Sequence, residues 1–172
     1  MDETLPTFDQ VVDLIRSPKP PLACRVVELR DGVAVRSART LFDGISGWYI
    51  ESDERVEFRH SDDFVVLDEG GELSRMGPGI HVHSNGWVKT PIQGRRMNLD
   101  GATGRVISRE EVDGRRSILV EFLGLRYPED TVFHLHIDLE TGIVLRTSRP
   151  DLGLILRLED LRIGTVEEPS DP

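Results

Sequence analysis

Hydrophobic residues near the amino terminus recur at the spacing of one face of an α-helix. They follow positions i, i+3, i+4 and i+7, and are Phe8, Val11, Val12 and Ile15. Thr7 and Gln10 have the spacing of a capping box, in which each side chain accepts a hydrogen bond from the other residue's backbone amide. We therefore predict an amphipathic helix over residues 7–16. The prolines within residues 18–21 end it, because proline lacks the amide hydrogen that a helix needs.

After residue 21 the pattern changes to an alternation of hydrophobic and polar positions, which is typical of β-strands. Asp31-Gly32 and Asp113-Gly114 each separate two alternating runs, and such pairs favour the type I′ turn of a β-hairpin. The predicted strands span residues 24–30, 33–41, 48–51, 56–61, 64–67, 72–75, 80–83, 105–112, 116–123, 131–139, 143–149 and 154–163.

Other segments interrupt this pattern. Asn85-Gly86 predicts a tight turn before Trp87. Residues 89–104 and 124–130 lack a clean period, so we predict loops there, with a short helical turn as an alternative in the first. Residues 165–172 are acidic and contain proline, and we predict a flexible tail.

The alternation places the apolar side chains of several strands on one face of the sheet. This predicts an all-β fold, which could be classed as α+β only because of its one helix. We predict a single domain over residues 1–164. A sheet of about ten antiparallel strands must curl, either as a curved sheet or as a half-open β-barrel. The apolar stripe of the amino-terminal helix is the natural cover, or lid, for its concave face.

Charge and composition narrow the possible partners. The 172 residues include 21 Lys and Arg against 31 Asp and Glu, a net charge of −10 that repels phosphate backbones and excludes nucleic acid. No apolar run is long enough for an integral membrane segment. The first residues carry no basic and apolar signal, so the sequence predicts a cytoplasmic location.

A resemblance to a known family adds to this. A helix followed by a long meander and by the segment 135–146, with Asp138, Thr141 and Gly142 at its turn, resembles the LolA-like superfamily. Residues 64–73 look like another hairpin of that group. The resemblance covers most of residues 23–164 and implies a half-open barrel with a helix lid and a hydrophobic cavity for acyl chains.

The main functional hypothesis is a non-enzymatic binding protein. Its concave face would take an acyl chain, a lipid or an apolar peptide segment. The predicted ligand-binding residues are Trp48, Trp87, Val120, Phe122, Phe133, Leu135, Ile137 and Leu156. The first alternative is a structural or regulatory module that binds a protein partner through its acidic surface or an exposed sheet edge.

The second alternative is a metal-dependent enzyme. His81 and His83 form one pair two residues apart, and His134 and His136 form another, so each pair projects from one face of a predicted strand. If these strands are neighbours, the four imidazoles could bind zinc or another divalent metal. The alternation places the histidines opposite the apolar face, where water reaches them. No catalytic motif is present, and the main hypothesis needs no cofactor.

Overall fold

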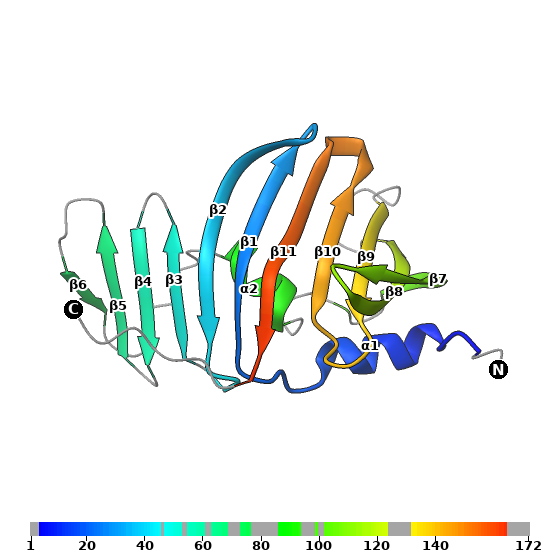
Figure 1. Ribbon diagram of the computed structural model, residues 1–172, viewed down its shortest axis with the longest axis horizontal. Helices are drawn as coiled ribbons and strands as arrows, with labels where there is room; N and C mark the ends of the chain where they lie inside the picture. Colours follow the sequence, from blue (N-terminus) through cyan, green and yellow to red (C-terminus); the bar gives the residue numbers. More distant parts are fainter. Residues whose placement is uncertain are drawn as a thin grey trace.

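The computed structural model describes residues 4–45, 47–52, 55–60, 63–68, 73–76, 86–93, 99, 102–123 and 132–164. This part of the chain forms one antiparallel sheet of eleven strands, together with helices α1 (Phe8–Arg16) and α2 (Gly86–Gln93) and a 3-10 turn, η1 (Pro150–Leu152) (Figure 1). The strands are β1 (Leu22–Arg30), β2 (Val33–Phe42), β3 (Trp48–Ser52), β4 (Arg55–His60), β5 (Asp63–Asp68), β6 (Leu73–Met76), β7 (Thr103–Val112), β8 (Arg115–Leu123), β9 (Val132–Asp138), β10 (Val144–Arg149) and β11 (Leu154–Ile163).

Helix α1 begins and ends where the sequence predicts. The amide of Gln10 donates to the Thr7 hydroxyl at 3.3 Å, and the amide of Thr7 donates to Gln10 Oε1 at 2.9 Å. Asp9 in the first turn and Arg16 in the last have the charges that the helix dipole favours. The predicted capping box is therefore confirmed.

Both predicted hairpin turns are also confirmed. Asp31 and Gly32 have φ angles of 48° and 81°, and Asp113 and Gly114 have 50° and 76°. Two successive residues with positive φ are what a type I′ turn requires. The hairpins β1–β2 and β7–β8 follow from these turns.

The sheet consists of two meanders joined at their ends. Its order is β6-β5-β4-β3-β2-β1-β11-β10-β9-β8-β7, so the first and last strands pair at the centre. In strand β11, Asp160 has a φ of 54°, and the pairing with β1 shifts between Ala23 and Arg25, which marks a β-bulge. The sheet is curved and unclosed, as the sequence predicts (Figure 1).

One face of the sheet carries both helices, and we call it the helix face; the other is the open face. Under α1, residues of β8, β9 and β10 pack with the helix, and these are Ile118, Val120, Phe122, Leu135, Ile137 and Val144. Under α2, the cluster joins Val88 and Ile92 of the helix to Leu22, Cys24, Val26, Ala38, Phe42, Trp48, Ile50, Ile143, Leu145 and Leu158. The hydrophobic core thus lies between the sheet and two separate covers.

The prediction was wrong in one segment. We predicted a turn before Trp87 and then a loop, with only a short helical turn as its alternative, but residues 86–93 form helix α2. Burial of Val88 and Ile92, both fully covered, stabilises this helix although Pro91 lies inside it. The predicted strand 80–83, the loop 124–130 and the tail 165–172 lie outside the described residues.

Candidate functional site

A small pocket of about 180 Å³ lies on the helix face, between α2 and strands β9, β10 and β11. Its lining is mostly hydrophobic and consists of Thr90, Pro91, Phe133, Thr147, Arg149, Leu154 and Leu156. Phe133 and Leu156 are two of the predicted ligand-binding residues, and both are half-buried. Pockets for drug-sized ligands measure about 300 to 1,000 Å³. This pocket therefore holds part of such a ligand while the helices stay in place.

Strand pairing joins the apolar floor of this pocket to a charged rim. Leu156 pairs with Thr147 across the β10–β11 ladder. The guanidinium carbon of Arg149 lies 5.2 Å from the centre of the Phe133 ring, a cation–π distance. Arg149 Nη2 also donates a hydrogen bond of 2.7 Å to Asp151. The pocket thus offers a hydrophobic surface next to a guanidinium group held in a fixed position.

Other predicted ligand-binding residues lie beneath α1 and are fully or almost fully buried; these are Val120, Phe122, Leu135 and Ile137. They pack against Val11, Val12 and Ile15 of the helix. The Phe122 ring contacts that of Phe8, with centroids 4.9 Å apart. Helix α1 therefore occupies the space that a ligand would need to reach these residues.

Trp48 lies in the part of the sheet that α2 covers, and Trp87 lies in α2 itself. Trp48 is buried, and its ring lies 4.4 Å from that of Phe42, centroid to centroid. Trp87 is half-buried in α2, and the guanidinium carbon of Arg36 lies 4.2 Å from its ring centre. Arg36 Nε also donates to the buried carboxylate of Glu28 at 2.7 Å. Trp48 is thus a core residue, whereas Trp87 lies at the rim of the core beside a cation.

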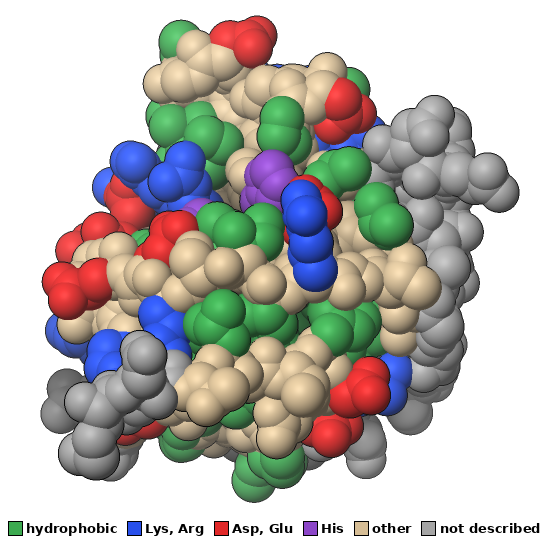
Figure 2. All heavy atoms as spheres, turned by 90° about the vertical axis from the view of Figure 1, so that its right-hand side faces the viewer, with side chains coloured by type: hydrophobic (Ala, Val, Ile, Leu, Met, Phe, Trp, Pro, Cys, Tyr) green, Lys and Arg blue, Asp and Glu red, His purple; other side chains and the backbone are tan. Residues whose placement is uncertain are grey.

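The described histidine pair lies on the open face, away from the pocket. His134 Nε2 is 3.5 Å from Glu121, and His136 Nε2 is 2.9 Å from Glu110. The Ser108 hydroxyl, with a smaller contribution from His136, holds the pKa of Glu110 below its ordinary value. Viewed from the β7 side, histidine side chains reach the surface among acidic, basic and hydrophobic ones (Figure 2).

The predicted zinc site is not assembled in the part of the chain that the structure describes. There, no group of three or more His, Cys, Asp or Glu side chains could hold a metal ion. His134 and His136 each contact a glutamate on a neighbouring strand. His81 and His83 lie outside the described residues.

The turn after β9 holds the residues on which the family resemblance rests. The buried Asp138 carboxylate accepts hydrogen bonds from Arg115 Nη2, at 2.8 Å, and from the Thr141 hydroxyl. Gly142 has a φ of 69°, and a Cβ there would lie 2.0 Å from the carbonyl oxygen of Leu14, near the end of α1. A glycine is required at this close approach. The Asp-x-x-Thr-Gly pattern therefore forms the surface on which the end of α1 packs.

No protein-family model and no curated protein matches the sequence. Solved structures, however, match its fold. The crystal structure of MucB superposes with a TM-score of 0.57 at 15% identity, over 93% of this chain and 60% of MucB. The lipoprotein LppX of Mycobacterium tuberculosis gives 0.52 at 13% identity, over 93% of this chain and 98% of LppX. A LolA superfamily protein of Nitrosomonas europaea, NE2245, gives 0.37 at 14% identity, over 95% and 96% of the two chains.

This chain has a LolA-like fold. It spans about 60% of the length of MucB. The resemblance inferred from the turn at Asp138 is therefore confirmed at the level of the fold. Within the described residues, neither helix is long and apolar enough to cross a membrane.

The cytoplasmic location predicted from the sequence is wrong. LppX is a lipoprotein, and the proteins that share the LolA-like fold point to a location outside the cytoplasm. The prediction rested on the first few residues alone.

Several pocket residues of this LolA-like fold were not predicted from the sequence. Thr147 and Arg149 lie on the helix face because they pair with Leu156 and Leu154, and a period-two count along β10 would have found them. Thr90 and Pro91 lie in α2, which the sequence pattern did not predict. Finding them would have required knowing where that helix packs.

Proposed function

We propose that this chain is a non-enzymatic binding module that takes an acyl chain or another extended apolar group against its helix face. The observation that carries the proposal is the pocket beside α2, in which Phe133, Leu154 and Leu156 remain half-exposed. These side chains continue the apolar surface that the two helices cover elsewhere. A LolA-like fold shared with the lipoprotein LppX supports this interpretation.

The size of the pocket determines how a ligand would be accommodated. At about 180 Å³ it holds one end of an acyl chain, so the rest of the chain requires that a helix moves. Thr90 and Pro91 of α2 form one wall, and no residue of α1 does. We therefore assign the moving cover to α2, whereas the sequence had favoured the amino-terminal helix.

A displacement assay tests this function. The purified chain is titrated with a fluorescent fatty acid whose emission rises in apolar surroundings, and palmitate is then added to displace it. We expect a gain in fluorescence that palmitate reverses. Native mass spectrometry of the purified protein should also show a co-purifying amphiphile. Absence of both signals would contradict the proposal.

A matched pair of variants locates the site. Leu156→Glu places a carboxylate in the pocket, and because a buried charge is costly we expect affinity for the fatty acid to fall about tenfold or more. Ile155→Glu places the same charge on the opposite face of the same strand, where pairing with Leu29 and Ser148 holds residue 155 away from the pocket. Equal losses in the two variants would rule out binding in this pocket.

A further inference from the structure

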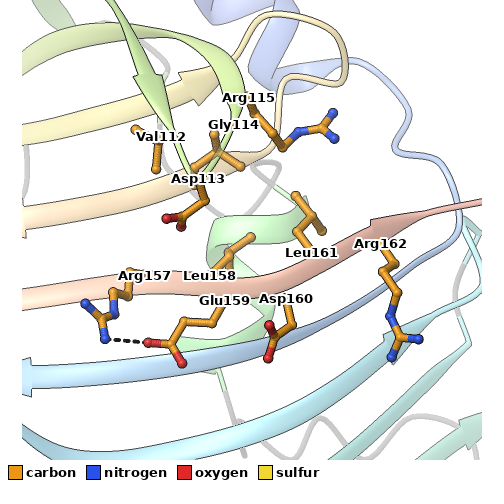
Figure 3. A pocket seen from close by; sticks show the side chains of 11 residues that line it. Val112, Asp113, Gly114, Arg115, Arg157, Leu158, Glu159, Asp160, Leu161 and Arg162 are labelled. Atoms are coloured by element: carbon orange, nitrogen blue, oxygen red, sulfur yellow. Dashed lines mark ion pairs between the residues drawn. The ribbon is translucent and has the colours of Figure 1, made fainter.

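A second and larger cavity, of about 980 Å³, lies between the tip of the β7–β8 hairpin and the second half of β11 (Figure 3). Residues 112–115 form one wall, and residues 157–162 form the other. Leu145 of β10 also lines it. We call this cavity the slot. It shares no lining residue with the pocket beside α2.

The slot lies where the sheet lacks a strand. The ladder between β10 and β11 ends at the pair Arg146–Arg157, but β11 continues to Ile163. On its other side β11 stays paired with β1 as far as Leu22. Within the described part of the chain, no strand pairs with the slot side of residues 158–163. Among the strands that the structure describes, this half of β11 is therefore a free edge inside an otherwise continuous sheet.

The floor of the slot is hydrophobic. Leu145 and Leu158 belong to the core cluster under α2 and are only 3% exposed. Val112 and Leu161 are partly buried against the same cluster. In Figure 3, Leu158 and Leu161 both extend from β11 toward the hairpin tip. An occupant of the slot would thus extend the existing core.

The slot is lined by three carboxylates and three guanidinium groups, some of which are already in ion pairs. Glu159 forms an ion pair with Arg157, as Figure 3 shows, and Asp138 forms one with Arg115. Among the described residues, the lining charges outside these ion pairs are Asp113, Asp160 and Arg162, so two carboxylates accompany one guanidinium group. The whole chain has a net charge of −10. Both facts favour a basic occupant.

We propose that the slot binds an extended, basic segment of a partner protein, which adds to the free edge of β11 as an extra strand. Backbone hydrogen bonds to residues 158–163 supply the affinity, as in other cases of β-strand addition. Alternate apolar side chains of the segment contact Leu158 and Leu161. The intervening Lys or Arg side chains lie near Asp113 and Asp160. This interaction does not depend on the pocket beside α2.

The bulge at Asp160 explains how a free edge coexists with a stable fold. An unpaired edge invites pairing with any strand, and proteins limit this with bulges and charged side chains. Asp160 supplies both, because its left-handed φ of 54° interrupts the strand and its carboxylate lies at the rim of the slot. A partner must therefore match both the bulge and the charge.

Hydrogen exchange on the full chain tests this proposal. The probe is a short, capped peptide of alternating Val and Lys, long enough to cover residues 158–163. We expect it to slow amide exchange in residues 158–163 at least about tenfold. Exchange in residues 154–157, which already pair with β10, should stay unchanged. Protection of both segments, or of neither, would overturn the proposal.

Two altered peptides separate strand addition from simple attraction. N-methylation at alternate residues removes backbone donors, so it should abolish the protection. A Val and Glu peptide should bind at least about tenfold more weakly, because it meets Asp113 and Asp160. If the N-methylated peptide protects residues 158–163 equally well, strand addition is wrong. If these residues become protected without peptide as protein concentration rises, the occupant is a second copy, and our choice of a basic partner is wrong.

Variants complete the test. Asp160→Lys should weaken binding of the Val and Lys peptide about tenfold, and Leu161→Glu should abolish it by charging the floor. Asp13→Lys makes the same charge change as Asp160→Lys on the exposed side of α1 and should leave binding unchanged. Equal weakening by Asp160→Lys and Asp13→Lys would show that net charge alone attracts the peptide, which would overturn the assignment to the slot.

Discussion

The two halves of the helix face are covered in different ways. Helix α1 has a complete capping box, favourable charges at both ends and an apolar stripe that packs on apolar side chains of β8, β9 and β10. Helix α2 has no acidic residue in its first turn and no basic one in its last, and it contains Pro91. In the same half of the sheet, Thr40 pairs with Cys24 and Ile50 of the cluster under α2, and its buried hydroxyl has no hydrogen-bond partner among the described residues.

This difference indicates which half can open. The α1 half has well-satisfied helix ends and is pinned by the close approach of Gly142 to Leu14. The α2 half contains the pocket, an unpartnered hydroxyl and a shorter helix. Regions with less favourable local interactions open first. We therefore expect α1 to act as a fixed part of the fold and α2 as the cover that moves.

The largest effect should come from disturbing the end of α1. Gly142→Ala adds a Cβ that would lie 2.0 Å from the Leu14 carbonyl oxygen, at a left-handed φ. We expect the free energy of unfolding to fall by about 4 kcal/mol in urea denaturation, because strain and clash add. Gly32→Ala is the control, with a φ of 81° and no atom within 4 Å of the new Cβ. It should cost about 1 kcal/mol. Equal losses would mean that α1 is not pinned there.

The next prediction compares the two covering helices, α1 and α2, directly. Ile15 of α1 and Ile92 of α2 are both 0% exposed, so Ile15→Ala and Ile92→Ala should each cost about 3 kcal/mol in urea denaturation. Their effects on Cys24 should differ. Burial in the cluster under α2 raises the pKa of this thiol to about 12, so it reacts slowly with disulfide reagents in the native state.

We expect Ile92→Ala to accelerate labelling of Cys24 by such a reagent at least about tenfold, because it loosens the helix above the thiol. Ile15→Ala, measured under the same native conditions, should change the labelling rate much less. Labelling that follows global stability alone, with the same rate in both variants, would show that the two halves open together.

A smaller effect should come from the polar group under α2. Thr40→Val replaces the unpartnered hydroxyl with a methyl group of similar size. We expect the free energy of unfolding to rise by about 1 kcal/mol in urea denaturation, since an unsatisfied buried hydroxyl is costly. A lower stability would show that the hydroxyl has a partner in solution and would remove one difference between the halves.

The smallest effect concerns the open face behind the α1 half. The pKa of Glu110 is lowered from its ordinary value of 4.5, first by the Ser108 hydroxyl and then by His136. Because the folded-state pKa is the lower one, the stability that this carboxylate contributes is fully present above pH 4.5 and is lost as the pH falls through the folded-state pKa. Glu110→Gln should therefore be less stable than the wild type at about pH 6, and the difference in urea denaturation should shrink as the pH falls below 4.5. A difference that does not change with pH would contradict this.

Local sequence signals predicted helix α1 and both Asp-Gly hairpin turns, but they did not predict helix α2. The capping pair Thr7 and Gln10 and the turn at Asp113 and Gly114 act within a few residues, so the sequence shows them directly. Helix α2 has Pro91 in its interior and is helical because its apolar residues are buried by distant strands. No short-range pattern reveals such a tertiary cause.

The candidate site shows the same limit of prediction from the sequence. Alternation identified the apolar face that includes Phe133 and Leu156, and both line the pocket. It could not tell them from Leu135, which has the same pattern but is covered by α1. Which part of an apolar face stays accessible depends on where the covering helices lie. The slot could not be predicted from the sequence for a similar reason. It exists because β10 pairs with only the first part of β11.

The pairing of β1 with β11 also sets the order in which the molecule can be completed. Ribosomes make β1 before the other described strands, yet its central neighbour β11 (Leu154–Ile163) emerges after all of them. Until then, each meander can form from neighbouring hairpins, but nothing joins them. Closing a contact over so long a stretch of chain costs entropy and slows folding. A nascent chain stopped before Leu154 would carry two half-sheets, with the edge of β1 exposed to aggregation or to a chaperone.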